Sequence, residues 1–567
     1  MSEISEVIAE TDATTARQAE EQKRLRELDC FVLDNSLRES TVGALRGHTL
    51  ENKWKIYEEV KRCGFKDVIV AAFSHNTRVD DHFVRQLAET GEDMSTFYAF
   101  SEGWGSISNG EPDLVTLPVG LDKMKTLQLQ NPIIEIDLAD SRIDWEKFTV
   151  ERVKNLLQER IKWVKENLAV DGNVLINYRD FSIAMLDPTT THRILSVTEF
   201  LARLPADMRP FGLIFEEPTG KNFPAQLGGW TAAVRKVMNV NDWNTGKLLV
   251  HVHEKWGLAE AAQLACLGNG ANGVWASLCA EGAALGHACT SVSLLNLIRL
   301  GNKKVLERYN CTELRRAAMR VTEITSGRPP HPKQPVYGER ALDMAFDFGG
   351  ISGGHVGKSD FDLATFFGEE APKRISTLAS ADMIQERLVN LFGDLDIFTL
   401  SVAEGMKKVM IDDLTHNRKE EYMSKMGLAV LFDRAGGSLT ESMRDVIEEV
   451  EVQDALHQHL LRKVREMWDT WDLRESVELI GDECLEFDSF YNGFMAPYFG
   501  CFRCDDTRKG LIAIDMDSDG RVDWSEFSLY LKWALHQYPN IKDVDELLSV
   551  TFRKGIIPAM HDELLTK

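Results

Sequence analysis

Two histidines and a carboxylate stand where they could hold a divalent metal ion. His251 and His253 are separated by one residue within an apolar run, and side chains two residues apart on a strand point to the same side. Glu39 closes the polar stretch 34–39, which directly follows another apolar run. One carboxylate with two imidazoles is a ligand set suited to Mn²⁺, Zn²⁺ or Fe²⁺. Taken alone, the His-x-His spacing has another interpretation. The two histidines could be polar residues at a strand end whose hydrogen bonds are made within the protein.

An acidic motif near the C-terminus has the spacing of a calcium-binding loop. Residues 515–526 read Asp-Met-Asp-Ser-Asp-Gly-Arg-Val-Asp-Trp-Ser-Glu, which matches the EF-hand loop at every ligand position and at its turn glycine. The expected calcium ligands are Asp515, Asp517, Asp519, the carbonyl of Arg521, Asp523 and Glu526. EF-hands usually occur in pairs, and residues 484–490 resemble the exit of a second loop with Ser489 where the bidentate Glu would stand. We therefore expect one functional calcium site beside a degenerate partner.

The elements that must position these residues follow from alternating short apolar runs and longer helical patterns. The runs are 30–34, 67–73, 95–100, 132–137, 173–178, 211–215, 248–253 and 273–278. Amphipathic stretches such as 49–63, 150–167 and 258–268 lie between them. Eight such units fit an α/β fold of the (β/α)8 TIM-barrel type better than an open doubly wound sheet. A barrel would gather Arg38, Glu39, the pair Glu216-Glu217 and the two histidines at its C-terminal mouth.

The chain of 567 residues is long enough for several domains. We expect a polar, frayed N-terminal tail over 1–26, the barrel over 27–300, a post-barrel subdomain over 301–375, a helical region over 376–465 and an all-α EF-hand pair over 466–560. The helical region is rich in Leu, Met and paired charges, and packing against a second copy or over the barrel is its expected role.

The composition restricts the classes of partner. Lys and Arg number 65 against 89 Asp and Glu, which gives a net charge of −24. Nucleic acids and anionic membranes attract clustered Lys and Arg, so this balance argues against both as partners. The sequence has no uncharged apolar run of about 18 residues, and its cysteines are scattered and odd in number, as in reduced cytosolic proteins. We expect a soluble cytoplasmic protein.

Three segments resemble the metal-dependent Claisen-condensing barrels, the family of isopropylmalate, homocitrate and citramalate synthases, to which hydroxymethylglutaryl-CoA lyase is related. Asp34-Asn-Ser-Leu-Arg-Glu39 is similar to the family's strand-one motif Asp-x-Thr-Leu-Arg-(Asp/Glu)-Gly. The second segment runs from His251-Val-His253 through Gly286-His-Ala-Cys-Thr-Ser-Val-Ser-Leu-Leu-Asn-Leu297. The third, residues 329–358, resembles the segment that follows the barrel in the synthases. The resemblance covers roughly residues 28 to 360, which include a pyruvate carboxyltransferase-like barrel, and the third segment favours the synthases over the lyase.

The resemblance implies an acyltransferase that condenses acetyl-CoA, or another acyl-CoA, with a 2-oxo acid. It implies Glu39 as a metal ligand and Arg38 as the group that stabilises an enolate oxygen. His287 replaces a ligating Asn, which makes it a further metal ligand and shifts the preference from Mg²⁺ towards Mn²⁺, Zn²⁺ or Fe²⁺. His355 is implied in proton transfer, across the interface of a homodimer. The EF-hand would add modulation by calcium.

Departures from the family pattern keep two alternatives open. The Glu usual in strand two is Val70, and the Glu-Asp near strand five, a position linked to proton transfer, reads Tyr178-Arg179-Asp180. One alternative is a lyase or aldolase that cleaves a 3-hydroxy acid, although residues 282–285 lack the lyase's Gly-Gly-Cys loop. The other is a catalytically silent barrel that serves as a calcium-sensing interaction protein.

Overall fold

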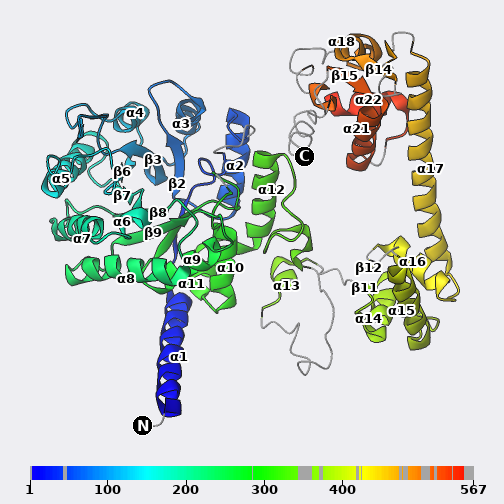
Figure 1. Ribbon diagram of the computed structural model, residues 1–567, viewed down its shortest axis with the longest axis horizontal. Coiled ribbons are helices and arrows are strands. Elements are labelled where there is room, and N and C mark those ends of the chain that lie inside the picture. Colours follow the sequence, from blue (N-terminus) through cyan, green and yellow to red (C-terminus); the bar gives the residue numbers. More distant parts are fainter. Residues whose placement is uncertain are drawn as a thin grey trace. The chain divides into compact units, whose positions relative to one another are not determined.

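The computed structural model divides the chain into two compact units, Met1–Leu342 with Asp360–Glu369 and Asp343–Ser359 with Glu370–Lys567 (Figure 1). It describes residues 3–41, 47–283, 285–342, 361–369, 375–416, 421–422, 424–471, 475–476, 483–499, 508, 511–515, 520–538 and 541–553. None of the helices within these ranges is long and apolar enough to cross a membrane.

Within the described residues, the first unit is built on a closed barrel in the order β1-β10-β9-β8-β7-β6-β3-β2, with every neighbouring pair parallel. The strands are β1 (Phe31–Asp34), β2 (Val68–Ala72), β3 (Phe97–Glu102), β6 (Asn131–Ile136), β7 (Leu175–Tyr178), β8 (Gly212–Glu217), β9 (Lys247–Val252) and β10 (Gly273–Ala276). Each predicted run is one of these strands, so the barrel prediction is confirmed. A small hairpin of β4 (Ile107–Ser108) and β5 (Glu111–Pro112) is inserted after β3.

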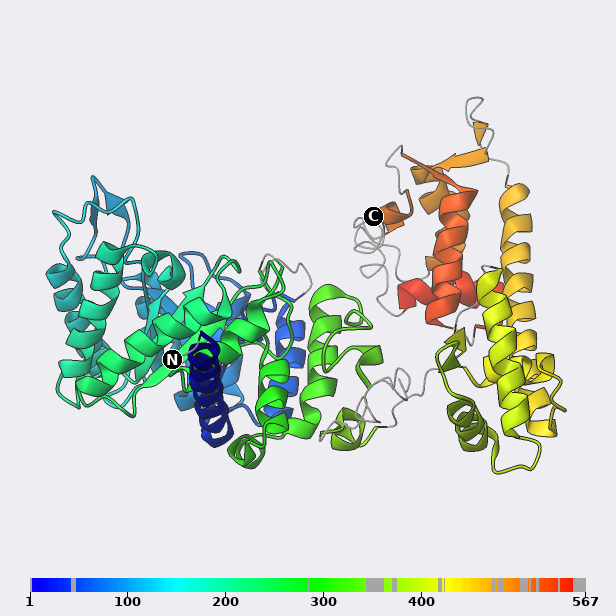
Figure 2. The same ribbon diagram turned by 60° about the horizontal axis from the view of Figure 1, so that its bottom comes forward.

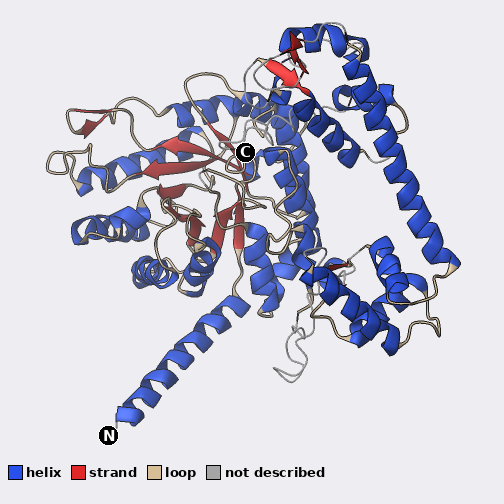
Figure 3. Ribbon diagram, turned by 45° about the vertical axis from the view of Figure 1, so that its right-hand side comes forward, coloured by secondary structure: helices blue, strands red, loops and turns tan. Residues whose placement is uncertain are grey.

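Helices follow the strands and cover the outside of the barrel (Figure 3). They are α2 (Leu50–Arg62), α3 (Val79–Glu89), α4 (Val119–Leu127), α5 (Val150–Asn167), α6 (Phe181–Ala184), α7 (Pro188–Arg203), α8 (Pro224–Val240), α9 (Ala259–Gly268) and α10 (Thr290–Arg299). α2 shows why such segments become helices: the side chain of Thr49 caps the N-terminus by accepting from the Asn52 N–H, and one face buries Ile56 and Val60.

The described helices of the region predicted as a post-barrel subdomain pack onto the barrel. α11 (Lys303–Arg308), α12 (Leu314–Ser326) and α13 (Leu363–Phe367) belong to the same compact unit as the strands. The reason is that their apolar side chains, such as Val305, Leu314 and Val321, join the hydrophobic core between the barrel and its helices.

The barrel interior has an apolar floor and a polar layer above it. Ile133, Leu175, Ile214 and Leu249 belong to an inner cluster to which every barrel strand contributes. Because side chains alternate along a strand, the residues two positions further along face the same interior. These are Glu135 on β6, Asn177 on β7, Glu216 on β8 and His251 on β9.

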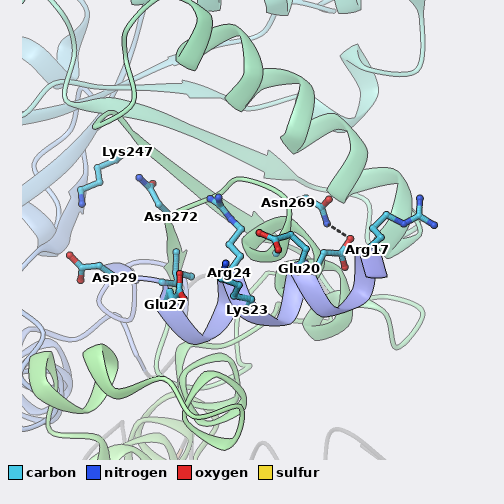
Figure 4. Close-up of a pocket in the computed structure, with 12 residues that line it drawn as sticks. Arg17, Glu20, Lys23, Arg24, Glu27, Asp29, Lys247, Asn269 and Asn272 are labelled. Carbon is cyan, nitrogen blue, oxygen red and sulfur yellow. Dashed lines mark hydrogen bonds between the residues drawn. The ribbon is translucent and has the colours of Figure 1, made fainter. Parts of the chain in front are cut away.

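The N-terminal segment, expected to be a frayed tail over 1–26, is the helix α1 (Glu3–Glu27). Its last turns are anchored, since Leu25 is buried and the Arg24 Nε donates to the carbonyl of Leu267 over 3.1 Å. A cavity of about 680 Å³ lies between α1 and the start of β9 and β10, lined by residues that include Lys247 and Asn272 (Figure 4). This end of the barrel is opposite to the mouth, so the cavity holds none of the residues predicted to do chemistry.

The second unit contains the predicted helical region. Its described helices include α14 (Ala381–Phe392), α15 (Leu400–Thr415), α16 (Lys425–Arg434) and the long α17 (Glu441–Asp469), which are drawn in olive to yellow in Figure 2. These four helices share an apolar cluster. α17 crosses the predicted boundary near residue 465. Its first turns contribute Met443 to this cluster and its last turns contribute Trp468 to the core of the C-terminal segment.

The C-terminal segment was expected to be all-α, and that is wrong for its described residues. β13 (Glu475–Ser476), β14 (Glu483–Glu486) and β15 (Arg521–Asp523) form an antiparallel sheet. α18 (Phe487–Ser489), α19 (Ala496–Phe499), α21 (Trp524–Gln537) and α22 (Val544–Arg553) surround it. The sheet forms because Leu485 and Val522 pair across β14 and β15 and are both fully buried.

Candidate metal centre at the barrel mouth

Barrel closure brings Glu39, His251 and His253 together. One ligand atom from each lies within 4.8 Å of the others, and within the described ranges this is the only such group of His, Cys, Asp or Glu. Glu39 follows β1 and the histidines end β9, so the three meet at the C-terminal mouth. All three side chains are buried.

Hydrogen bonds orient both imidazoles. The Nδ1 of His251 lies 2.9 Å from the carbonyl oxygen of Trp275, while its buried Nε2 has no hydrogen-bond partner among the described residues. The Nε2 of His253 lies 2.9 Å from the Oε1 of Glu216. Carbonyl and carboxylate oxygens are acceptors, so the protons sit on these two nitrogens and the lone pairs lie on the others.

The electrostatics separate the two imidazoles. Burial, together with the charges of His253 and His287, lowers the pKa of His251 well below its ordinary value. Burial also acts to lower the pKa of His253, but the Glu216 carboxylate outweighs it and raises that pKa. His251 is therefore neutral and ready to be a ligand, whereas His253 carries its proton to higher pH.

Glu39 is held as a carboxylate. Burial acts to raise its pKa, but His251, Arg38 and the neighbouring imidazoles outweigh it and bring the pKa to about 2. Its Oε1 accepts from the Ala283 N–H over 3.2 Å, and its Oε2 pairs with Arg38. The Arg38 guanidinium lies 5.0 Å from the ring centre of Phe100, and 32% of its side chain is exposed. A fixed cation thus faces the mouth beside an anionic ligand.

His287, the fourth predicted ligand, lies near the group but is not part of it. Its ring centre is 5.0 Å from that of His251, yet its Nδ1 lies 2.8 Å from the Ala288 oxygen and its Nε2 lies 3.0 Å from the Glu281 oxygen. Both ring nitrogens of His287 face backbone oxygens, so in this conformation neither is directed to a cation held by Glu39. His355, predicted to transfer a proton, lies outside the described residues.

The two glutamates that end β8 have different roles. Glu216 faces the interior and orients His253, as described above. Glu217 is fully buried and accepts hydrogen bonds from Ser182, Thr219, Gly220 and Asn222. Glu217 therefore holds the loop that follows β8 and is not available to a ligand.

A second polar cluster, not predicted from the sequence, lies at the mouth. The Asn177 Nδ2 donates to the Glu135 Oε1 over 3.0 Å, and Arg179 pairs with Asp137 and Glu102. Glu135, Glu102, Asp137 and Arg179 line a cavity of about 620 Å³. The sequence signal for this cluster is the spacing within strand β6, because Glu135 stands two residues after the inward-facing Ile133.

The described part of the predicted calcium loop is ordered around its ends. The Gly520 N–H donates to Asp515 over 2.9 Å. Asp523 caps α21 by accepting from the Glu526 N–H over 2.8 Å, and Glu526 accepts from the Asp523 N–H over 3.0 Å. The Arg521 side chain pairs with Glu486 of the neighbouring strand. Asp517 and Asp519 lie outside the described residues.

The chain was compared with family models, curated proteins and solved structures. No family model matches the chain. It is 24% identical over 318 residues to a protein of Geobacillus sp. (strain Y412MC10) named 2-isopropylmalate synthase, and the match covers 56% of this chain and 57% of that relative. Similar solved structures include the HMG-CoA lyase of Bacillus subtilis, with 15% identity and a TM-score of 0.41 over 54% of this chain and 96% of that one. Another is the carboxyl transferase domain of Rhizobium etli pyruvate carboxylase with pyruvate and biocytin, with 11% identity and a TM-score of 0.37 over 54% of this chain and 48% of that one. The chain thus spans little more than half the length of the curated relative.

Proposed function

We propose that the barrel is a metal-dependent acyltransferase that condenses acetyl-CoA, or another acyl-CoA, with a 2-oxo acid. The observation that carries the proposal is the buried group of Glu39, His251 and His253 at the C-terminal mouth of the barrel, with Arg38 beside it. The sequence likeness to the curated synthase supports the same reaction class.

The residues of the mouth fit a divalent cation. Glu39, His251 and His253 would hold it, since the unpartnered Nε2 of His251 and the anionic Glu39 are the atoms that a cation requires. A carboxylate with two imidazoles suits Mn²⁺, Zn²⁺ or Fe²⁺ better than Mg²⁺. When bound, such an ion acts as a Lewis acid towards the carbonyl of a 2-oxo acid.

The guanidinium group of Arg38 is placed to stabilise negative charge. It is fixed by Glu39 on one side and by the ring of Phe100 on the other, and part of it is open to the mouth. A preorganised guanidinium at this position would hold the enolate oxygen that forms when the acyl-CoA loses a proton. His355, from the segment after the barrel, is proposed as a proton-transfer group contributed by the second subunit of a homodimer.

We propose further that the C-terminal loop binds calcium and modulates the barrel. The support is the full ligand pattern, together with the observed packing of β15 against β14 and the capping contacts of Asp523 and Glu526. Asp515 and Glu526, the first and last ligands of the pattern, are both buried, which suits carboxylates that converge on one cation.

The test is the release of free CoA thiol from acetyl-CoA by the full chain loaded with Mn²⁺ or Zn²⁺. A panel of 2-oxo acids is assayed with and without calcium. His253→Ala should abolish the release, whereas His192→Ala, which removes an exposed histidine of α7, should leave it unchanged. Thiol release supported by one oxo acid identifies the acceptor. If folded, metal-loaded protein releases no thiol with any oxo acid of the panel, the synthase is rejected in favour of a cleaving enzyme or a catalytically silent calcium-sensing barrel.

A further inference from the structure

Glu135 occupies a position in the barrel mouth outside the candidate metal centre. It lies on β6 directly above the apolar floor of the barrel, in register with Asn177 on β7. The Asn177 Nδ2 donates to its Oε1 over 3.0 Å, and Asn177 is itself fully buried. The Oδ1 of Asn177 has no partner among the residues that the structure describes. The amide therefore fixes one carboxyl oxygen of Glu135 and leaves the other to the cavity.

The cavity beside Glu135 is large enough for a substrate. Its volume of about 620 Å³ is within the range of small-molecule sites, and its walls include Glu102, Asp137 and Arg179 at the ends of β3, β6 and β7. Gly105, Ser106 and Ile107, at the start of the β4–β5 hairpin, also line it. A molecule in this cavity would touch Glu135 at the end of the barrel where barrel enzymes carry out their chemistry.

The same mouth holds Glu135 and the candidate metal centre. Four charged groups on other elements act on Glu135: Glu102 and Glu216 raise its pKa, whereas Arg179 and Arg38 lower it. Arg38 pairs with Glu39, and Glu216 contacts His253, so two of the four belong to the surroundings of the metal centre. Burial is the largest influence and brings the pKa of Glu135 to about 7.

A carboxyl group with these properties can both accept and return a proton near neutral pH. The proposed condensation needs one, because a proton must leave the methyl carbon of the acyl-CoA before the new C–C bond forms. We propose that Glu135 is a further proton-transfer residue, contributed by the barrel itself, and that Asn177 is its positioning residue. The proposal rests on the proposed function for the identity of the substrates.

The reactants of the proton-transfer step are acetyl-CoA and a 2-oxo acid. The Glu135 carboxylate takes a proton from the methyl carbon of the thioester, and the electron pair of that C–H bond forms the new C–C bond to the carbonyl carbon. The π electrons of the carbonyl move to its oxygen, which receives the proton back from Glu135 and becomes a hydroxyl group. Water then hydrolyses the thioester and releases CoA and a carboxylate, so no further reactant is needed.

The experiment compares Glu135→Gln with Asp67→Asn in the full chain. Asp67 is a matched control, since burial also raises its pKa but it precedes β2 at the opposite end of the barrel, where it accepts from the Tyr98 hydroxyl. Glu135→Gln should lower kcat by about 10²-fold or more, with a much smaller change in KM, and should remove a rate dependence on pH near neutrality. Asp67→Asn should retain the rate and the pH profile. An active wild-type enzyme whose kcat and pH profile survive Glu135→Gln would overturn the assignment.

Two further measurements separate this proposal from the proposed function. Deuterium uptake into the methyl group of acetyl-CoA by metal-loaded protein in D₂O requires a base but no acyl transfer, and it should disappear in Glu135→Gln. Infrared difference spectra of the metal-free protein between pH 6 and pH 8 should show a protonated carboxyl signal that Glu135→Gln reduces by one group and Asp67→Asn retains, with Asp34 and Glu260, which burial also brings to a pKa of about 7, contributing equally in both variants. If no thiol is released but Glu135-dependent deuterium exchange is intact, the synthase activity is rejected and the role of Glu135 as a base is retained. Absence of the exchange, or of the Glu135 contribution to the infrared signal, would reject the role of Glu135.

Discussion

The Nδ1 of His251 lies 2.9 Å from the carbonyl oxygen of Trp275, and the two rings stack with their centres 4.6 Å apart. This contact decides which ring nitrogen can bind a cation, because a carbonyl oxygen requires the proton on Nδ1 and leaves the lone pair on Nε2. The carbonyl belongs to β10 and the histidine to β9, so strand pairing itself selects the tautomer.

Glu216→Gln should weaken the binding of Mn²⁺ or Zn²⁺ by about 10- to 100-fold, the usual effect of losing a partner that orients a ligand. The carboxylate of Glu216 is the acceptor that fixes the His253 ring, and a glutamine in its place can turn its amide nitrogen towards the ring. Competition with a chromogenic chelator measures the affinity. Glu199→Gln, which removes an exposed partner of Arg203, is the control, and equal affinities of the two variants would contradict the role of Glu216.

Glu526→Gln should weaken calcium binding beyond about 10⁻³ M, the weak end of EF-hand affinities, because the last ligand of the loop is lost. Calorimetry measures the binding, and the fluorescence of Trp468 and Trp524 in the surrounding core reports it independently. Glu486→Gln removes the partner of Arg521 on the neighbouring strand and should bind calcium as the wild type does. Tight calcium binding by Glu526→Gln would show that the loop is not the site.

Glu260→Gln should change how stability depends on pH. Burial raises the pKa of Glu260 to about 7, although the Cys289 N–H and the Ser293 hydroxyl donate to it. The folded state therefore binds the proton more tightly than the unfolded state, and stability falls as the pH rises from the unfolded pKa, near 4.5, to about 7. In the variant, the fall in the free energy of unfolding over this pH range should be smaller by up to about 3 kcal/mol. Urea unfolding at pH 5 and pH 8 measures it, and an unchanged difference between the two pH values would contradict the prediction.

Leu249→Ala should reduce the free energy of unfolding by about 2–5 kcal/mol, since Leu249 is fully buried in the inner cluster beneath His251. Leu306→Ala, at a side chain that is 45% exposed on α11, should cost far less. Chemical unfolding of both variants gives the comparison. A similar loss in both would mean that the floor of the barrel is not well packed.

The barrel could be predicted from the sequence because its signals are local. A run such as Pro132 to Asp137 is apolar, short and bounded by polar turns, and helix α5 was predicted over the residues that form it. The N-terminal segment was mispredicted as a tail because its residues are polar, whereas its end is held by Leu25 and Arg24 against elements more than 200 positions away. The small sheet of the C-terminal segment was missed for a related reason, since β14 and β15 are short and far apart in sequence.

The amino-acid sequence by itself determined the eight βα units, the His-x-His pair, the carboxylate of Glu39 and the spacing of the calcium loop, since each depends on the order of neighbouring residues. Only the tertiary structure decided which side chains share the mouth. It placed Glu135 in the mouth with Arg38 and Glu216, and it turned both nitrogens of His287 towards backbone carbonyls. The physical reason is that barrel closure sets the neighbours of each side chain, and those neighbours then set its protonation and its orientation.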